Sequence, residues 1–232
     1  MVSVILTAAI GTLLLSSSQQ AQPHSPTTSE RTTVENYVQD VFFQTDNSGS
    51  MTFRGVCRYT QQGRVVYSDE LANPPTGPFK NIDEAMAALS AVDTHVSWKR
   101  DAEGLIRVSD DRVIGDVLRV RLKRIHFKAV ADATTAIEQV MAGPEVRDYL
   151  KRKHIDALVL RTTFVTAGTA LPKLSDELRD VTAAQALDRI IRFFPGVWFY
   201  GECSCDSSRR VTLRASSVGW PTGVMAQSTV LR

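Results

Sequence analysis

The sequence lacks the short motifs by which most enzyme families can be detected. It has no G-x-S-x-G turn for a serine nucleophile and no glycine-rich loop that could hold phosphate groups. Its 4 histidines are scattered, and no pair has the i, i+4 spacing of a helical zinc site. Asp110 and Asp111 are adjacent carboxylates, but such a pair is usually a solvated turn. These absences predict a protein that is not an enzyme and that needs no metal and no cofactor.

The chain also has little net charge, and no long apolar run follows its first residues. Lysine and arginine number 27 and the acidic residues 25, which gives a formal net charge of +2 at pH 7. A nucleic-acid-binding protein usually concentrates far more positive charge, so we expect no nucleic acid as a partner. No later segment approaches the roughly 20 apolar residues of a spanning helix, so we expect no membrane span in the mature protein.

Residues 1–15 contain no charged side chain and include an apolar run of the length found in secretory signal peptides. We interpret residues 1–18 as a signal peptide that is removed before Gln19. Residues 19–33 are rich in Gln, Ser, Thr and Pro and are expected to form a disordered spacer. A wrongly assigned start and a short membrane anchor are the alternatives, because no lysine or arginine precedes the apolar run. The expected location is periplasmic or secreted.

Three cysteines in an exported protein permit one disulfide and leave one thiol. The favoured bridge joins Cys57 to either Cys203 or Cys205. A bridge or redox pair formed by Cys203 and Cys205 is one alternative, although redox pairs usually have two intervening residues. A metal site is another alternative, but a metal would need additional ligands.

A capped helix followed by a tryptophan-bearing strand occurs twice in the chain. In the first copy Asn81 can cap an amphipathic helix, and Trp98 lies on the strand that follows. In the second copy Thr182 and Gln185 form a capping pair, and Trp198 follows. This repetition predicts two small helix-on-sheet units.

The expected fold class is therefore α+β, with two βαββ-like units and a mixed or antiparallel sheet. The first unit spans residues 34–128 and the second residues 129–215, and the tail at residues 216–232 has no assignable pattern. Periodicity and turn residues predict the following elements: a helix from 34 to about 46, a hairpin at 51–59 and 65–67, strands at 96–99, 105–108, 118–128 and 158–165, helices around 137–141 and from 144, and a hairpin at 197–202 and 210–215.

The strand expected at residues 118–128 alternates apolar residues with the basic residues Arg119, Arg121 and Lys123. Its apolar face then shifts by one position to Ile125 and Phe127, which implies a bulge. Basic residues two apart on a strand project to the same side, so this row could bind anionic lipid, glycan phosphate or an acidic protein. The alternative is that the row is simply the solvated face of a sheet.

Residues 174–215 combine a strand, a helix that begins D-V-T, an aromatic strand and a return strand. The residues that carry this pattern are Leu178-Arg179-Asp180-Val181-Thr182, Ala186-Leu187, Trp198-Phe199-Tyr200 and Val211-Thr212-Leu213. The pattern resembles the short amino-terminal domain shared by secretins and TonB-dependent receptors. That resemblance implies a periplasmic α+β module that makes protein contacts, in rings or in signalling, and it brings no catalytic residue.

The leading hypothesis is a non-enzymatic, exported module that binds another envelope protein or a second copy of itself. A glycan- or anionic-lipid-binding protein that uses the basic strand and exposed tryptophans is the first alternative. An exported thiol enzyme that uses Cys203 and Cys205 is the second. The burial of Trp98 and Trp198 and the bonding of Cys57 distinguish these hypotheses.

Overall fold

The computed structural model describes residues 32–61, 63–161, 172–205 and 208–217. The expected signal peptide, nearly all of the spacer, residues 162–171 and most of the tail lie outside these residues. The chain divides at residue 30, and all described elements belong to the unit that begins at residue 31. In chain order they are α1 (Val34–Thr45), β1 (Gly49–Thr60), β2 (Gly63–Ser68), α2 (Ile82–Val92), β3 (Val96–Arg100), β4 (Ile106–Asp110), the 3-10 helix η1 (Val117–Arg119), β5 (Arg121–Val130), α3 (Ala133–Met141), α4 (Pro144–Lys153), β6 (Ile155–Val159), β7 (Leu174–Thr182), α5 (Ala183–Phe193), β8 (Gly196–Cys205) and β9 (Ser208–Ser217).

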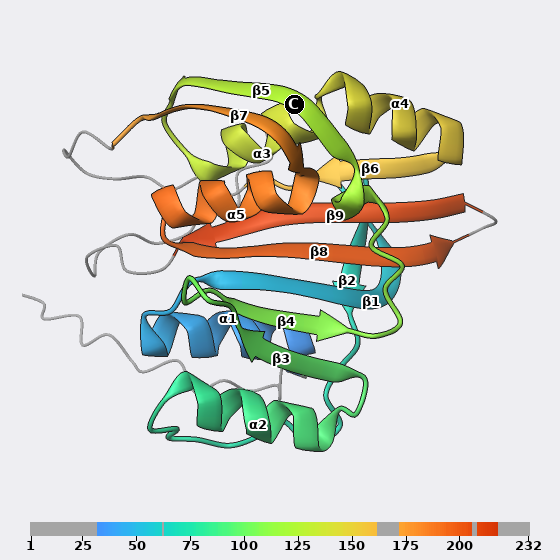
Figure 1. Ribbon diagram of the computed structural model, residues 1–232. Helices are drawn as coiled ribbons and strands as arrows, with labels where there is room; N and C mark the ends of the chain where they lie inside the picture. The colour runs from blue at the N-terminus through green and yellow to red at the C-terminus, as the bar shows by residue number, and fades with distance from the viewer. Residues whose placement is uncertain (1–31, 62, 162–171, 206–207, 218–232) are drawn as a thin grey trace, which may run out of the picture. The chain divides into compact units, whose positions relative to one another are not determined.

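A mixed central sheet organises the described residues and confirms the predicted α+β class. Its strands follow the order β3-β4-β1-β8-β9-β6, and β2 pairs with β1 (Figure 1). β1 lies between β4 and β8 and is parallel to both. Its Gly49 pairs with Ile106 of β4 on one side and with Val197 of β8 on the other. β6 is parallel to β9, whereas β3–β4, β1–β2 and β8–β9 are antiparallel. One sheet therefore contains strands from both halves of the sequence.

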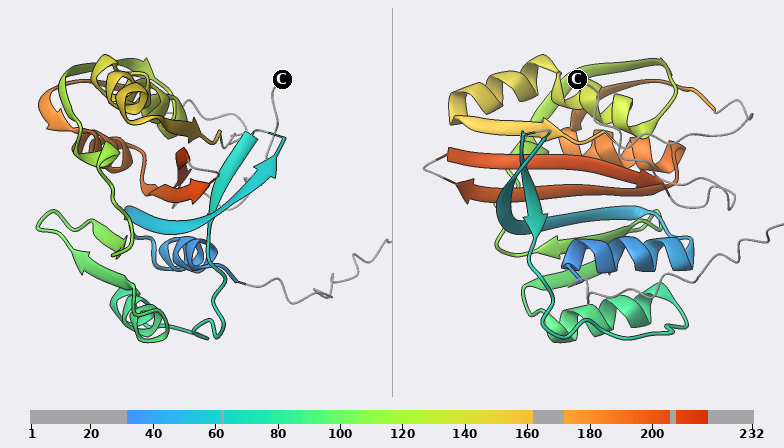
Figure 2. Two further views of the ribbon diagram at one scale, coloured as in Figure 1. Left: turned by 90° about the vertical axis from the view of Figure 1, so that its right-hand side faces the viewer. Right: turned by 180° about the vertical axis from the view of Figure 1, so that it is seen from behind.

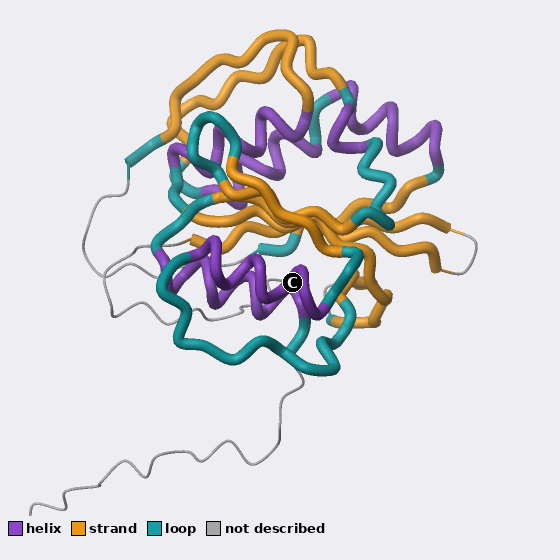
Figure 3. Tube along the Cα trace, turned by 60° about the horizontal axis from the view of Figure 1, so that its bottom comes forward, coloured by secondary structure: helices purple, strands orange, loops and turns teal. Residues whose placement is uncertain are grey.

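Each face of the central sheet has its own hydrophobic core. Along β8, Val197 and Phe199 pack with α1 and α2 on one face, and Trp198 and Tyr200 pack with α3 and α5 on the other. β5 and β7 form a separate two-stranded sheet that covers α3 and α5 (Figures 1 and 2). This second sheet is the layer farthest from α1 and α2, so the outer side of β5 faces away from both cores. Figure 3 shows the same arrangement with helices on either side of the central strands.

Helix α5 forms where the sequence predicts it, for local reasons. The Thr182 side chain accepts a hydrogen bond from the Gln185 backbone N at 3.2 Å, and the Gln185 side chain accepts one from the Thr182 backbone N at 2.8 Å. This capping box satisfies two amides that the first turn would otherwise leave unpaired. Leu187 and Ile190 are fully buried, and burying such a side chain stabilises a fold by roughly 1.5–3 kcal/mol.

The strand predicted from residue 118 begins only at Arg121, because residues 117–119 form η1. Val117 and Leu118 are neighbours and both are buried. An extended strand sends neighbouring side chains to opposite faces, whereas a helical turn can bury both. Arg119 therefore lies on η1, and the prediction that it shares a strand with Arg121 is wrong.

The predicted shift of the apolar face is present, but its cause differs from the prediction. Leu122 and Ile125 are both buried while their pairing with β7 stays in register. Asp180 on β7 has a φ of 51°, and the pairing stays in register on both sides of it, so the backbone of β7 deviates there and no residue is inserted. The register shift occurs after Phe127, where Ala129 also has a φ of 51°.

The strand predicted at residues 158–165 is instead β6, which begins three residues earlier at Ile155. Helix α4 ends at Lys153, His154 caps it with a φ of 51°, and the chain then enters β6 directly. Ile155 is buried and pairs with Arg209 of β9, which fixes the start of the strand. Residues 162–165 lie outside the described part of the chain.

Candidate binding surface

The outer side of β5 consists of basic side chains, while its apolar side chains turn inward. Leu122, Ile125 and Phe127 are buried in the core beneath the strand. The residues that are exposed on the other side are Arg121, Lys123, Arg124, His126 and Lys128. β5 contains no acidic residue. We call these five exposed residues the β5 basic face.

Acidic residues of the neighbouring strand compensate part of this charge. The Glu177 carboxylate of β7 accepts hydrogen bonds from Arg179 Nε at 2.6 Å and from Arg124 Nη2 at 2.5 Å. These two bonds lower the pKa of Glu177 below its ordinary value. Arg121 Nε lies 3.7 Å from Asp180 Oδ1. Exposed pairs of this kind are weak, so a partner can compete for Arg121 and Arg124, and no ion pair among the described residues involves Lys123 or Lys128.

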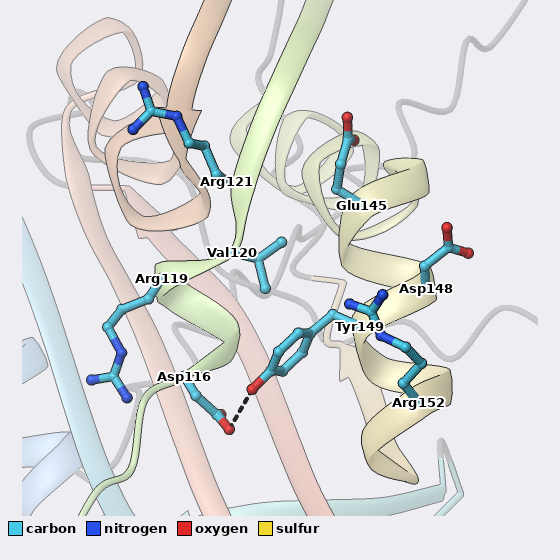
Figure 4. A pocket seen from close by; sticks show the side chains of 8 residues that line it. All are labelled: Asp116, Arg119, Val120, Arg121, Glu145, Asp148, Tyr149 and Arg152. Atoms are coloured by element: carbon cyan, nitrogen blue, oxygen red, sulfur yellow. Dashed lines mark hydrogen bonds between the residues drawn. The ribbon is translucent and has the colours of Figure 1, made fainter.

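A groove of about 500 Å³ separates residues 116–121 from helix α4, beside the start of β5 (Figure 4). Its two walls consist of Asp116, Arg119, Val120 and Arg121 on one side and Glu145, Asp148, Tyr149 and Arg152 on the other. Three arginines and three carboxylates therefore line the groove, which gives it mixed charge. In Figure 4 the Tyr149 ring extends across the groove toward Asp116.

The structure brings together two of the three basic residues singled out in the sequence. Arg119 and Arg121 both line the groove, although they lie on η1 and β5 respectively. Lys123 is part of the β5 basic face but does not line the groove. Its backbone N donates a hydrogen bond to Glu145 Oε1 at 3.2 Å, which ties β5 to the start of α4.

A hydrogen-bonded network runs from the groove into the interior. Asp116 Oδ2 accepts hydrogen bonds from Tyr149 Oη at 2.7 Å and from Arg209 Nη1 at 2.8 Å. Arg209 Nε donates to Glu202 Oε1 at 2.6 Å, and Tyr200 Oη donates to Glu202 Oε2 at 3.2 Å. Asp116 and Arg209 are 93 residues apart in the chain, so no local sequence pattern signals this network.

The network shifts the pKa values of Asp116 and of the two tyrosines. The hydrogen bond from Arg209 holds the pKa of Asp116 well below its ordinary value. The bond to Asp116 raises the pKa of Tyr149, and burial raises the pKa of Tyr200 well above its ordinary value. Near neutral pH Asp116 is therefore a carboxylate and both phenols keep their protons.

The predicted link between Cys57 and the final hairpin is confirmed, with Cys203 as the partner. The two residues form a disulfide whose Cα atoms are 6.4 Å apart. The side chain of Cys205 lies outside the described part of the structure. Cys203 is thus held in the bridge, so the redox pair considered for Cys203 and Cys205 is not formed.

The two tryptophans do not form an exposed platform for a glycan. Trp198 is only 2% exposed, and its Nε1 donates a hydrogen bond to Asp188 Oδ1 at 3.0 Å. Arg107 Nη2 also donates to Asp188, at 2.8 Å. Trp98 is partly buried against the core formed with α1 and α2. Both side chains therefore serve mainly in packing.

The interpretation of Asp110 and Asp111 as a solvated turn is wrong for Asp110 and confirmed for Asp111, which is exposed in the turn after β4. Asp110 is buried and accepts hydrogen bonds from Arg112 Nη2 at 2.7 Å and from the Arg54 backbone N at 3.0 Å. Burial alone would raise the pKa of Asp110, but these hydrogen bonds lower it below its ordinary value. Asp111 Oδ1 lies 2.9 Å from His95 Nδ1. Asp110 alone therefore clamps β1 to the turn after β4.

Among the described residues, no group of three or more His, Cys, Asp and Glu side chains could hold a metal ion. No helix in the described part of the chain is both long enough and apolar enough to cross a membrane. No protein-family model, no curated protein and no solved structure matches the chain. The chemistry of the surface is therefore the basis on which a function can be proposed.

Proposed function

We propose that the mature chain is an exported, non-enzymatic module that binds an acidic surface of another envelope protein or of a second copy of itself. The β5 basic face and the groove beside it form the binding site. The observation that carries this proposal is the alternation along β5, where apolar residues anchor the strand in the core and basic residues cover its outer side. Such a surface attracts acidic partners over long range and fixes their orientation.

The groove adds specific contacts to this long-range attraction. Tyrosine and arginine are the residues that most often carry binding energy at protein interfaces, and Tyr149 and Arg152 lie together on one wall. Tyr149 is already held in place by Asp116, so little side-chain freedom is lost when a partner binds. The three carboxylates of the groove favour a partner that presents both signs of charge over a uniformly acidic polymer.

Only the order of elements along the chain supports a module of the type that the sequence resembles, because β7 pairs with β5 and not with β8 or β9. β7, α5, β8 and β9 follow one another as strand, helix, aromatic strand and return strand, which is the order of the secretin and TonB-receptor amino-terminal domain. The disulfide between Cys57 and Cys203 supports an oxidising compartment, because such bonds are rare in the cytosol. Both points favour an envelope protein that acts by contact.

Site-specific crosslinking in intact cells tests the proposal. A photoreactive residue replaces Lys123 in the β5 basic face, and in a matched control it replaces Lys99, an exposed lysine on β3. We expect the Lys123 position to yield a discrete crosslinked species of defined mass, identified by mass spectrometry, and the Lys99 position to yield none. Equal yields at both positions, or no crosslink at Lys123, would contradict the proposal.

A further inference from the structure

A second surface, remote from β5 in the sequence, lies on the hairpin formed by β1 and β2. Residues 49–54 of β1 pair with β8, whereas residues 55–60 pair only with β2. We call residues 55–68 the arm. Figure 2 shows the arm turning away from the plane of the central strands. A two-stranded hairpin is marginally stable by itself, so the arm needs support from the rest of the fold.

Three contacts clamp the base of the arm onto β8 and β9. The disulfide joins Cys57 to Cys203, and the Val66 backbone N donates a hydrogen bond to Thr212 Oγ1 at 3.0 Å. The third contact is between Phe53 of β1, just before the arm, and Gly201 of β8. A Cβ added at Gly201 would lie 2.5 Å from the Phe53 ring. The chain thus places a covalent bond and a required glycine where the arm begins. The clamp holds the arm in one position before any partner arrives.

The arm and the half-strand that leads into it are strongly basic. Residues 49–68 contain Arg54, Arg58 and Arg64 and no acidic residue, a net charge of +3. Since the whole chain has a net charge of +2, the remainder carries −1. Two large side chains of the arm are also exposed, Tyr59 at 76% and Val56 at 45%. Cationic, aromatic and aliphatic groups therefore occur together at this end of the hairpin.

These groups lie on both faces of the arm. Arg58 sits over the Tyr67 ring, with its guanidinium carbon 5.7 Å from the ring centre, and Arg64 sits over the Tyr59 ring at 4.3 Å. Because Arg58 and Tyr59 are consecutive in a strand, the two stacked pairs face opposite sides. Tyr59 shares its side with the bridged Cys57 and is nevertheless largely exposed. On the other side Val65, which pairs with Arg58, is buried, whereas Arg58 itself is exposed.

We propose that the arm is a contact site for the headgroups of anionic phospholipids. A folded protein partner offers a surface that can meet one side of a hairpin, whereas a fluid headgroup layer can surround the tip and contact both sides. Guanidinium groups bind phosphate through paired hydrogen bonds, and tyrosine favours the interface between water and lipid. The contact is peripheral, and it is separate from the β5 basic face that binds the protein partner.

Cosedimentation of the oxidised mature protein with vesicles tests this inference. The probes are mixed phosphatidylcholine and phosphatidylglycerol vesicles and pure phosphatidylcholine vesicles. We expect binding to the mixed vesicles only, and a decrease in partitioning of about tenfold for Arg58→Glu and for Arg64→Glu alike. A decrease for only one of the two substitutions would show that lipid meets one face of the arm and would overturn the two-sided contact on which the lipid assignment rests. Equal binding to both vesicle types would overturn it as well.

A charge-matched variant separates this site from the proposed protein-binding site. Arg121→Glu with Lys123→Glu changes the net charge as much as Arg58→Glu with Arg64→Glu does. We expect the β5 variant to retain vesicle binding and the arm variant to retain the Lys123 crosslink. If both double variants lose vesicle binding equally, general attraction explains it and the arm is not the site. Saturable binding of the arm to soluble polyglutamate, with no binding to vesicles, would assign it to an acidic protein and would contradict the proposal.

Discussion

Arg209 and Arg121 are the same residue type in two opposite environments. Arg209 is largely buried and bonded to two carboxylates of its own chain, Asp116 and Glu202. Arg121 is exposed, and its nearest carboxylate, Asp180, is 3.7 Å away and equally exposed. The hydrogen-bond donors of Arg209 are used within the chain, whereas Arg121 presents a charge that a partner can use. The comparison shows that the location of an arginine's acceptors, and not its presence, separates a structural charge from a binding charge.

The largest effect on the free energy of unfolding is expected when the ion pairs of Arg209 are removed. Arg209→Ala leaves the Asp116 and Glu202 carboxylates without their common cation, and the Glu202 side chain is only 6% exposed. Loss of one partner of a buried ion pair typically costs about 3–5 kcal/mol. Urea denaturation measures the free energy of unfolding, and Arg121→Ala is the control, with an expected change within about 0.5 kcal/mol. Comparable losses for the two variants would show that the environments do not differ as described.

The disulfide gives the next largest effect. Cys57→Ser with Cys203→Ser removes a cross-link between residues separated by 146 positions, and such a cross-link typically contributes about 2–4 kcal/mol. Backbone amides of residues 55–68 should lose protection from hydrogen exchange before those of α5, because the arm has few other anchors. Uniform loss of protection across both regions would contradict the view of the disulfide as a clamp for the arm.

The pH dependence of stability tests the contribution of carboxylates that are hydrogen-bonded within the chain. Asp116 and Asp110 have lowered pKa values in the folded protein, so their contribution is complete above the unfolded value of about 3.9 and disappears as pH falls below it. Burial raises the pKa of Glu35 above its ordinary 4.5, although Arg214 opposes this rise, so proton uptake by Glu35 slightly stabilises the fold as pH falls toward 4.5. Stability should therefore be greatest in mildly acidic solution and fall steeply below about pH 4.

Asp116→Asn tests whether Asp116 contributes to the predicted loss of stability at acid pH, which we call the acid limb. The variant should be less stable at neutral pH, yet its urea midpoint should fall less steeply below about pH 4, because one carboxylate no longer takes up a proton there. Denaturation curves at a series of pH values give both quantities. An acid limb that is unchanged in slope would show that Asp116 does not contribute to it.

Local patterns in the sequence predicted local structure well. The capping residues Thr182 and Asn81 stand at the expected helix starts, because an N-cap depends on contacts within one turn. The hairpin of β1 and β2 also forms near the expected residues. Cys57 was expected to bridge to the last hairpin, and the structure selects Cys203 as its partner. The fold class follows from the alternation of such elements along the chain.

Long-range pairing was not predictable from periodicity. Nothing near β1 indicates that it lies between β4 and β8, because parallel strands are joined by distant connections. The same applies to Asp116, whose role depends on Arg209 at the far end of the chain. The basic row was recognised in part, since Arg121 and Lys123 are exposed on β5, but the burial of both Val117 and Leu118 places Arg119 on η1.

The central claim is that the β5 basic face serves binding and not stability, and one double variant tests it directly. Arg121→Glu with Lys123→Glu should change the free energy of unfolding by less than about 0.5 kcal/mol, because both side chains are exposed. The same variant should lose most of the capture of the protein crosslinked through Lys123, and the remaining capture should depend less on salt. Lys80→Glu with Lys99→Glu carries the same change in net charge and should capture normally. Unchanged capture by the β5 variant would contradict the account. So would a loss of capture that comes with a large decrease in the free energy of unfolding.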